Sequence, residues 1–85
     1  KVWQLPLDNE LRQDVESQVA DIGNSALTRY AGAITAAMVL EFFVNGIPWS
    51  HIDIAGAACI DKRRSWIAPG STGYGVRTLL NYLGI

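Results

Sequence analysis

The chain has 85 residues, a formal net charge of -1, and a hydrophobic fraction of 49% against 18% charged residues. A chain of this length forms one small domain or part of one, and its hydrophobic content excludes a disordered tail. Because the net charge is close to zero, no basic stripe is available for a nucleic acid or an anionic membrane surface, and we expect neither partner.

The first predicted element is an amphipathic surface helix that follows Asp8 and extends to Gln18. Aspartate is a preferred N-cap, because its carboxylate accepts a hydrogen bond from a free backbone N–H in the first turn. Leu11, Val15 and Val19 then recur at helical spacing. We therefore expect one apolar face that packs on the rest of the domain.

A second helix is predicted over residues 31–44, after a loop at residues 20–26 that contains Gly, Asn and Ser and has no hydrophobic period. This helix is apolar on nearly all sides. It contains Glu41 and is shorter than the roughly 20 apolar residues that a membrane span needs, so we expect a buried helix. Asn45-Gly46 is a typical helix C-terminus, and Pro48 prevents continuation.

Residues 49–56 predict a strand with two different faces. Strand alternation divides them into two sets, Trp49, His51, Asp53 and Ala55 on one face and Ser50, Ile52, Ile54 and Gly56 on the other. One face therefore carries two ionisable groups, and the other is mostly apolar. Such a face is either an active surface or a buried pair whose polar atoms are satisfied.

The last predicted element is a helix capped by Ser71 or Thr72, after a polar loop tip around residues 61–65. Its buried stripe is formed by four residues, Val76, Leu79, Leu80 and Leu83. The predicted order is helix, helix, strand, helix. One strand cannot satisfy its own backbone donors and acceptors, and the sequence has no initial Met. We therefore expect a piece of a longer polypeptide.

Three constellations allow a chemical and a structural interpretation. His51 and Asp53 could be metal ligands or an acid/base pair, with Cys59 or Asp61 as a third ligand, or a structural pair bonded to nearby backbone. Cys59 could be a thiolate nucleophile with His51 as its base, or a small packed hydrophobe. The glycine-rich residues 70–75 could hold a phosphate, or form a turn and a helix cap. We favour the structural interpretation of each.

A resemblance to a known family covers the whole chain and is carried by five segments, KVWQLPL, ADIGN, RYAGAITAA, WSHIDIAGAA and GSTGYGVRTLLNYL. In this order and at this spacing they resemble the leucyl aminopeptidases, cytosolic metallopeptidases that remove N-terminal residues from peptides. The resemblance implies an α/β fold, with residues 1–85 as the C-terminal part of a catalytic domain whose central mixed sheet is covered by helices.

The resemblance also implies a mechanism and a set of partners. Two divalent metal ions, zinc or manganese, would polarise the scissile carbonyl and activate a bridging water. The family's ligands are a lysine, aspartates and a glutamate that lie upstream of the matched segment, so no catalytic or metal-binding residue is assigned in this chain. Ala55 and Ala58 match positions that line the pocket for the first substrate side chain. Peptides with a free N-terminus, a homohexamer and a cytoplasmic location are implied as well.

Three hypotheses follow from these observations. The first is that residues 1–85 supply a substrate-pocket wall and packing to a Leu-preferring aminopeptidase, and are inactive alone. The second is a non-enzymatic remnant that associates with itself or with an aminopeptidase through unpaired strand edges. The third is an independent metal or thiol site at His51, Asp53 and Cys59.

Overall fold

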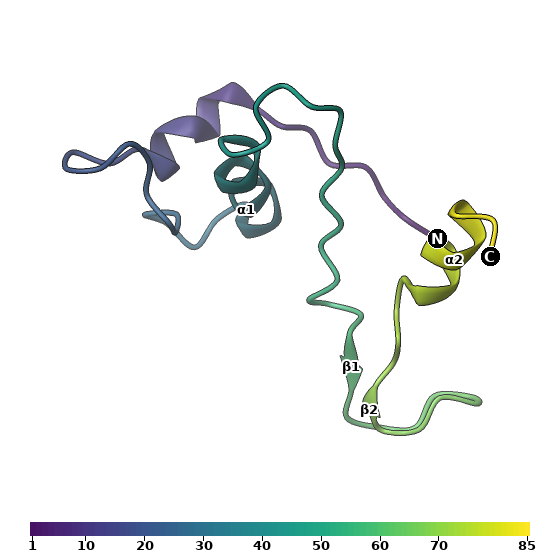
Figure 1. The fold of residues 1–85 in the computed structure, drawn as a ribbon. Coiled ribbons are helices and arrows are strands. Elements are labelled where there is room, and N and C mark those ends of the chain that lie inside the picture. The colour runs from purple at the N-terminus through teal and green to yellow at the C-terminus, as the bar shows by residue number, and fades with distance from the viewer. The chain divides into compact units, whose positions relative to one another are not determined.

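The computed structural model describes residues 1–85, which form two compact units, unit 1 (Lys1–His51) and unit 2 (Ile52–Ile85) (Figure 1). The elements in chain order are the 3-10 helix η1 (Asn9–Val15), helix α1 (Gly32–Glu41), strands β1 (Cys59–Ile60) and β2 (Gly70–Ser71), and helix α2 (Val76–Tyr82). The segment thus has the helices and strands of a small α/β fragment. Its sheet has two antiparallel strands, and no central mixed sheet is formed.

Helix η1 begins as predicted but is shorter and tighter than predicted. The Asp8 carboxylate accepts a hydrogen bond from the Glu10 N–H at 3.0 Å, which confirms the N-cap. The helix ends at Val15, whereas the sequence pattern extended it to Gln18. The Val15 carbonyl accepts from the Gly23 N–H at 2.7 Å. It therefore bonds the following loop rather than a continued α-helical turn.

The core of unit 1 lies between η1 and α1, which pack against each other (Figure 1). Its buried residues are Val15 from η1 and three residues of α1, Thr35, Ala37 and Met38. Met38 is only 1% exposed. Thr35 is buried with its hydroxyl within 3.2 Å of the Gly32 carbonyl and 3.3 Å of the Ala31 carbonyl, so its polar group is satisfied.

Helix α1 is buried on one side only, and the prediction of a helix buried all round is wrong for this segment. Leu40, Phe42 and Phe43 at its C-terminal end are exposed, although the two phenylalanine rings stack edge to face with centroids 5.2 Å apart. Helix η1 is too short to cover more than one face of α1. The helix stops at Glu41, and tight turns through Asn45, at a φ of 51°, replace its predicted last turn.

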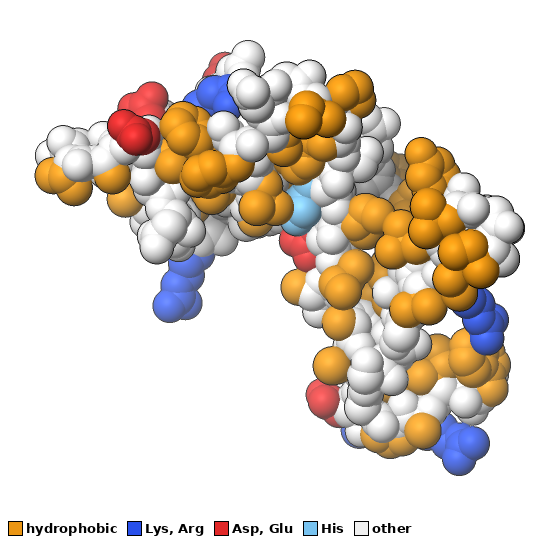
Figure 2. Space-filling view, viewed as in Figure 1, with side chains coloured by type: hydrophobic (Ala, Val, Ile, Leu, Met, Phe, Trp, Pro, Cys, Tyr) orange, Lys and Arg blue, Asp and Glu red, His pale blue; other side chains and the backbone are white.

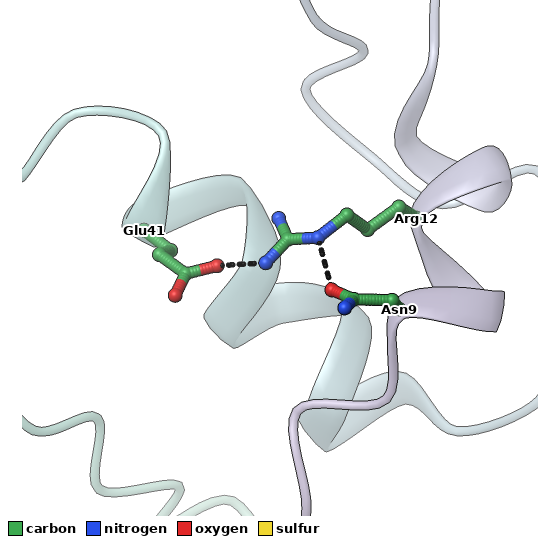
Figure 3. A network of polar contacts seen from close by, with 3 residues as sticks. All are labelled: Asn9, Arg12 and Glu41. Carbon is green, nitrogen blue, oxygen red and sulfur yellow. Dashed lines mark hydrogen bonds and ion pairs between the residues drawn. The ribbon is translucent and has the colours of Figure 1, made fainter.

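Three polar side chains join η1 to α1 at the edge of the unit 1 core (Figure 3). The Arg12 guanidinium donates to the Glu41 carboxylate at 2.6 Å through Nη2, and to the Asn9 side-chain oxygen at 2.7 Å through Nε. Asn9 lies one turn before Arg12 on η1. It therefore orients the guanidinium toward α1.

The predicted strand at residues 49–56 is not formed. Residues 49–54 are neither helix nor strand, and residues 55–57 form a turn. The Asp53 carboxylate accepts from the Ala55 N–H at 2.9 Å, a local bond that bends the backbone where the strand would continue. No neighbouring strand pairs with this segment, and an extended backbone becomes a β-strand only when it is paired.

Unit 2 instead forms a short hairpin further along the chain. Strand β1 pairs antiparallel with β2, and Cys59 lies opposite Ser71. The predicted polar loop at residues 61–65 forms part of the exposed connection between the two strands. Cys59 is free and exposed, so the expectation that its thiol packs as a small hydrophobe is wrong for this segment. No helix of unit 2 packs on the sheet that β1 and β2 form.

Helix α2 is capped differently from the prediction. Ser71 belongs to β2, and the N-cap of α2 is Gly75, at a φ of 89° and with no side-chain cap bond. The Arg77 guanidinium on α2 lies 5.0 Å from the ring centre of Trp66, which joins the hairpin loop to the helix. None of the helices in the two units has the length and apolarity that a membrane crossing requires.

The predicted apolar stripe of α2 is exposed, which corrects the prediction that it is buried. Its four residues are Val76, Leu79, Leu80 and Leu83, with exposed fractions between 42% and 65%. No residue of unit 2 is buried. Figure 2 shows hydrophobic side chains at the surface of both units. The hairpin is too small to cover this stripe. The helical spacing of the four apolar residues is therefore present, but no element of the segment packs on them.

Candidate substrate-pocket segment

The two residues expected to line a substrate pocket lie on one tightly bonded turn of unit 2. The turn begins at Asp53, whose carboxylate accepts from the Ala55 N–H. The Ile54 carbonyl then accepts from the N–H groups of Ala57 and Ala58, at 2.9 and 2.8 Å. Ala55 is exposed at the turn and Ala58 is partly buried at its end. Residues 55–58 of the turn are thus all Ala or Gly, and Ala55 and Ala58 each contribute only a methyl group.

Thr72 closes this turn from the other side of the hairpin. Its N–H donates to the Ala58 carbonyl at 2.8 Å, and its hydroxyl donates to the Ala57 carbonyl at 2.6 Å. The same hydroxyl oxygen accepts from the Tyr74 N–H at 3.2 Å. The sequence pattern identified Thr72 only as a possible helix cap. A threonine inside a glycine-rich turn was the available signal, but its partners lie 14 and 15 residues away.

The other candidate residues do not assemble into a reactive site. Asp53 bonds local backbone, as the structural interpretation expected, and His51 is partly buried at the end of unit 1. Cys59 lies exposed on β1. No group of three or more His, Cys, Asp or Glu side chains is arranged to hold a metal ion. The residues present therefore do not fit a two-metal centre, and no metal-dependent step is assigned to them.

A separate hollow of 430 Å³ lies in unit 1, between the loop at residues 24–29 and α1. Its lining includes Asn24, Arg29, Thr35 and Leu40. It contains no carboxylate, imidazole or thiol, so its lining offers no typical metal-ligand set and no His, Asp or Glu general base. Neither of the expected pocket residues lines this hollow, so the turn at residues 53–58 remains the candidate site.

Comparison of the sequence with known proteins places this chain in a family. The model of the cytosol aminopeptidase family, catalytic domain, matches residues 1–80. The chain belongs to the cytosol aminopeptidase family. A probable cytosol aminopeptidase of Aquifex aeolicus is 51% identical to it over 85 residues, which cover 98% of this chain and 17% of that protein. The resemblance recognised from the five sequence segments is therefore confirmed.

Other members of the cytosol aminopeptidase family match to a similar extent. The probable cytosol aminopeptidase of Thermosynechococcus vestitus is 47% identical over 98% of this chain and 16% of its own length. That of Nostoc punctiforme is 44% identical over 100% of the chain and 17% of its own length. The chain thus spans about one sixth of the length of these relatives. No solved structure gives a significant match.

Proposed function

We propose that residues 1–85 are the C-terminal part of the catalytic domain of a metallo-aminopeptidase that removes Leu-like N-terminal residues from peptides. In this proposal the segment supplies one wall of the pocket for the first substrate side chain, through Ala55 and Ala58. The observation that carries the proposal is the catalytic-domain match over residues 1–80, because it extends across both units of the segment.

The burial pattern supports a role within a larger catalytic domain. Four residues of unit 1 are buried and none of unit 2, while large apolar side chains are exposed in both. A stable domain covers most of its large apolar side chains, so these faces require further packing partners. In the proposal, the rest of the catalytic domain packs on them, and the complete enzyme assembles into a homohexamer in the cytoplasm.

The small side chains of the turn support the pocket assignment. A pocket for a Leu-like side chain needs apolar walls and enough room for a branched group. Alanine at both positions provides methyl groups and little volume. Exposure of Ala55 within the segment leaves this methyl free to contact a ligand. The proposed metal ions, zinc or manganese, are held by residues outside this segment, and no hydrolytic step is assigned to its side chains.

The first test is the intact mass of the natural gene product together with its hydrolysis of Leu-p-nitroanilide. A mass several times 9.3 kDa and Mn²⁺- or Zn²⁺-dependent hydrolysis are expected. The 85-residue chain alone, supplied with either metal, is expected to be inactive. Robust hydrolysis by the isolated chain would contradict the assignment of the catalytic groups to other residues.

The pocket wall is tested in the complete gene product by A58V. The added methyl groups narrow the pocket, and the ratio of kcat/KM for Leu- to Ala-p-nitroanilide is expected to fall about tenfold. A20V is the matched control, because it adds the same side-chain volume as A58V at an exposed loop residue of unit 1. An unchanged ratio in A58V would remove Ala58 from the pocket wall.

A second candidate function is a non-enzymatic interaction module. The observation that favours it is the exposed apolar stripe of α2, which offers an association surface. A natural gene product with a mass near 9.3 kDa that forms a discrete oligomer would support this function. The same result would exclude the aminopeptidase, since the segment carries no metal-ligand cluster.

A further inference from the structure

We propose that Thr72 is a positioning residue that sets the substrate selectivity of the pocket by fixing the direction of the Ala58 methyl group. This inference rests on the proposed function, in which Ala58 lines the pocket for the first substrate side chain. Thr72 itself lies on the neighbouring segment of the hairpin, directly after β2, and is not assigned a contact with substrate.

The hydrogen bonds around Ala58 involve both of its flanking peptide groups. In the preceding peptide group, the Ala57 carbonyl accepts from the Thr72 hydroxyl and the Ala58 N–H donates to the Ile54 carbonyl. In the following peptide group, the Ala58 carbonyl accepts from the Thr72 N–H at 2.8 Å, and the hydroxyl oxygen lies 3.1 Å from it. Both soft dihedral angles of Ala58 are therefore restrained.

The backbone conformation of Ala58 determines where its methyl group lies in the proposed pocket, because an alanine side chain has no rotamers. A longer side chain can rotate about χ1 and adapt to a substrate, whereas the Cβ of alanine follows from the backbone dihedral angles alone. A rotation of the peptide group before Ala58 moves this methyl directly. The Thr72 hydroxyl is the only side-chain group that bonds the Ala57 carbonyl, and together with the bond from the Ala58 N–H to the Ile54 carbonyl it restrains that rotation.

The Thr72 hydroxyl is itself held in place. Its oxygen accepts from the Tyr74 N–H at 3.2 Å while its proton is donated to the Ala57 carbonyl. The group is partly buried, where an unmade hydrogen bond costs more than at the surface. Loss of the hydroxyl removes one hydrogen bond from the Tyr74 N–H and one from the Ala57 carbonyl. The turn is then expected to take up more than one conformation.

The test uses the complete gene product with three substitutions. T72V is nearly isosteric and removes the hydroxyl, T72S retains the hydroxyl, and S71A removes a hydroxyl from the adjacent exposed position. The readout is the ratio of kcat/KM for Leu- to Phe-p-nitroanilide, with kcat and KM determined separately. T72V is expected to lower this ratio about tenfold, mainly through KM for the Leu substrate. T72S and S71A are expected to keep the wild-type ratio.

A merely structural role gives a different pattern. If Thr72 only stabilises the fold, T72V reduces the active fraction, so kcat falls equally for both substrates and the KM values and the ratio stay constant. That result would overturn the inference, as would a T72S ratio that changes as much as that of T72V. If T72V is not recovered folded, T72A removes the same donor without a β-branched side chain, and its ratio decides in the same way.

The failure of this inference is distinguishable from the failure of the proposed function. An active wild-type enzyme whose ratio changes in A58V but not in T72V retains the pocket assignment and excludes Thr72 as a positioning residue. A wild-type gene product that hydrolyses no aminoacyl-p-nitroanilide overturns both. Changed ratios in A58V and T72V, with an unchanged ratio in T72S, support both.

Discussion

The guanidinium of Arg12 donates to the Glu41 carboxylate at 2.6 Å and connects two helices whose paired residues are 29 positions apart. Both side chains are partly exposed, at 45% and 30%. Water therefore screens this ion pair, and its contribution to stability is small. The additional bond from Arg12 to Asn9 restricts the guanidinium and reduces the entropy lost when the pair forms.

A double-mutant cycle with R12Q and E41Q is expected to give a coupling energy of about 0.5–1 kcal/mol in urea unfolding of the complete gene product. Added salt at about 1 M is expected to reduce this coupling, because the Debye length falls to roughly 3 Å. The cycle also removes errors from unrelated effects of each substitution. A coupling that is zero at low salt would show that the contact contributes nothing to stability.

Replacement of Met38 by alanine tests the core of unit 1. Met38 is 1% exposed, so M38A removes buried methylene and sulfur contacts and leaves a cavity. We expect a loss of about 2–5 kcal/mol in the free energy of unfolding, visible as a lower thermal midpoint. Q18A, on an exposed residue after η1, is the control and is expected to change the free energy by less than about 0.5 kcal/mol. Equal effects of the two would contradict the assigned core.

Substitution of Asp8 tests the start of η1. D8A removes the acceptor for the Glu10 N–H and is expected to cost about 1 kcal/mol, whereas D8N keeps a side-chain oxygen at the same place. Native-state amide hydrogen exchange gives the local stability of Asn9–Val15. Faster exchange of this segment in D8A but not in D8N is expected. If D8N exchanges as fast as D8A, the effect arises from the lost charge rather than from the cap.

Two substitutions of glycine by alanine are expected to change the stability of the protein in opposite directions. Gly75 has a φ of 89°, where a side chain is strained, so G75A is expected to destabilise the protein by about 1–2 kcal/mol. Gly32 is the first residue of α1, and a Cβ there meets no atom within 4 Å. G32A is expected to stabilise the protein by up to about 1 kcal/mol through the lower entropy of the unfolded chain. Thermal midpoints that shift in the same direction would contradict this difference.

Local sequence signals predicted the positions of most elements because their causes lie within a few residues. The Asp8 cap needs only the N–H two positions later, and Asn45-Gly46, both at positive φ angles, form part of the turns that follow α1. The strand at residues 49–56 was predicted wrongly because alternation describes side chains and says nothing about the partner that pairs the backbone. The Asp53 bond to the Ala55 N–H is local, but the alternation pattern does not reveal it.

By itself, the sequence determined the family and the small side chains at Ala55 and Ala58, since these depend on residue identity. The tertiary structure alone decided that Arg12 reaches Glu41 and that Thr72 holds the peptide groups around Ala58. These partners are separated by 14 to 29 residues. Such contacts form only when the chain folds back on itself, because no local periodicity specifies which distant backbone carbonyl a hydroxyl will meet.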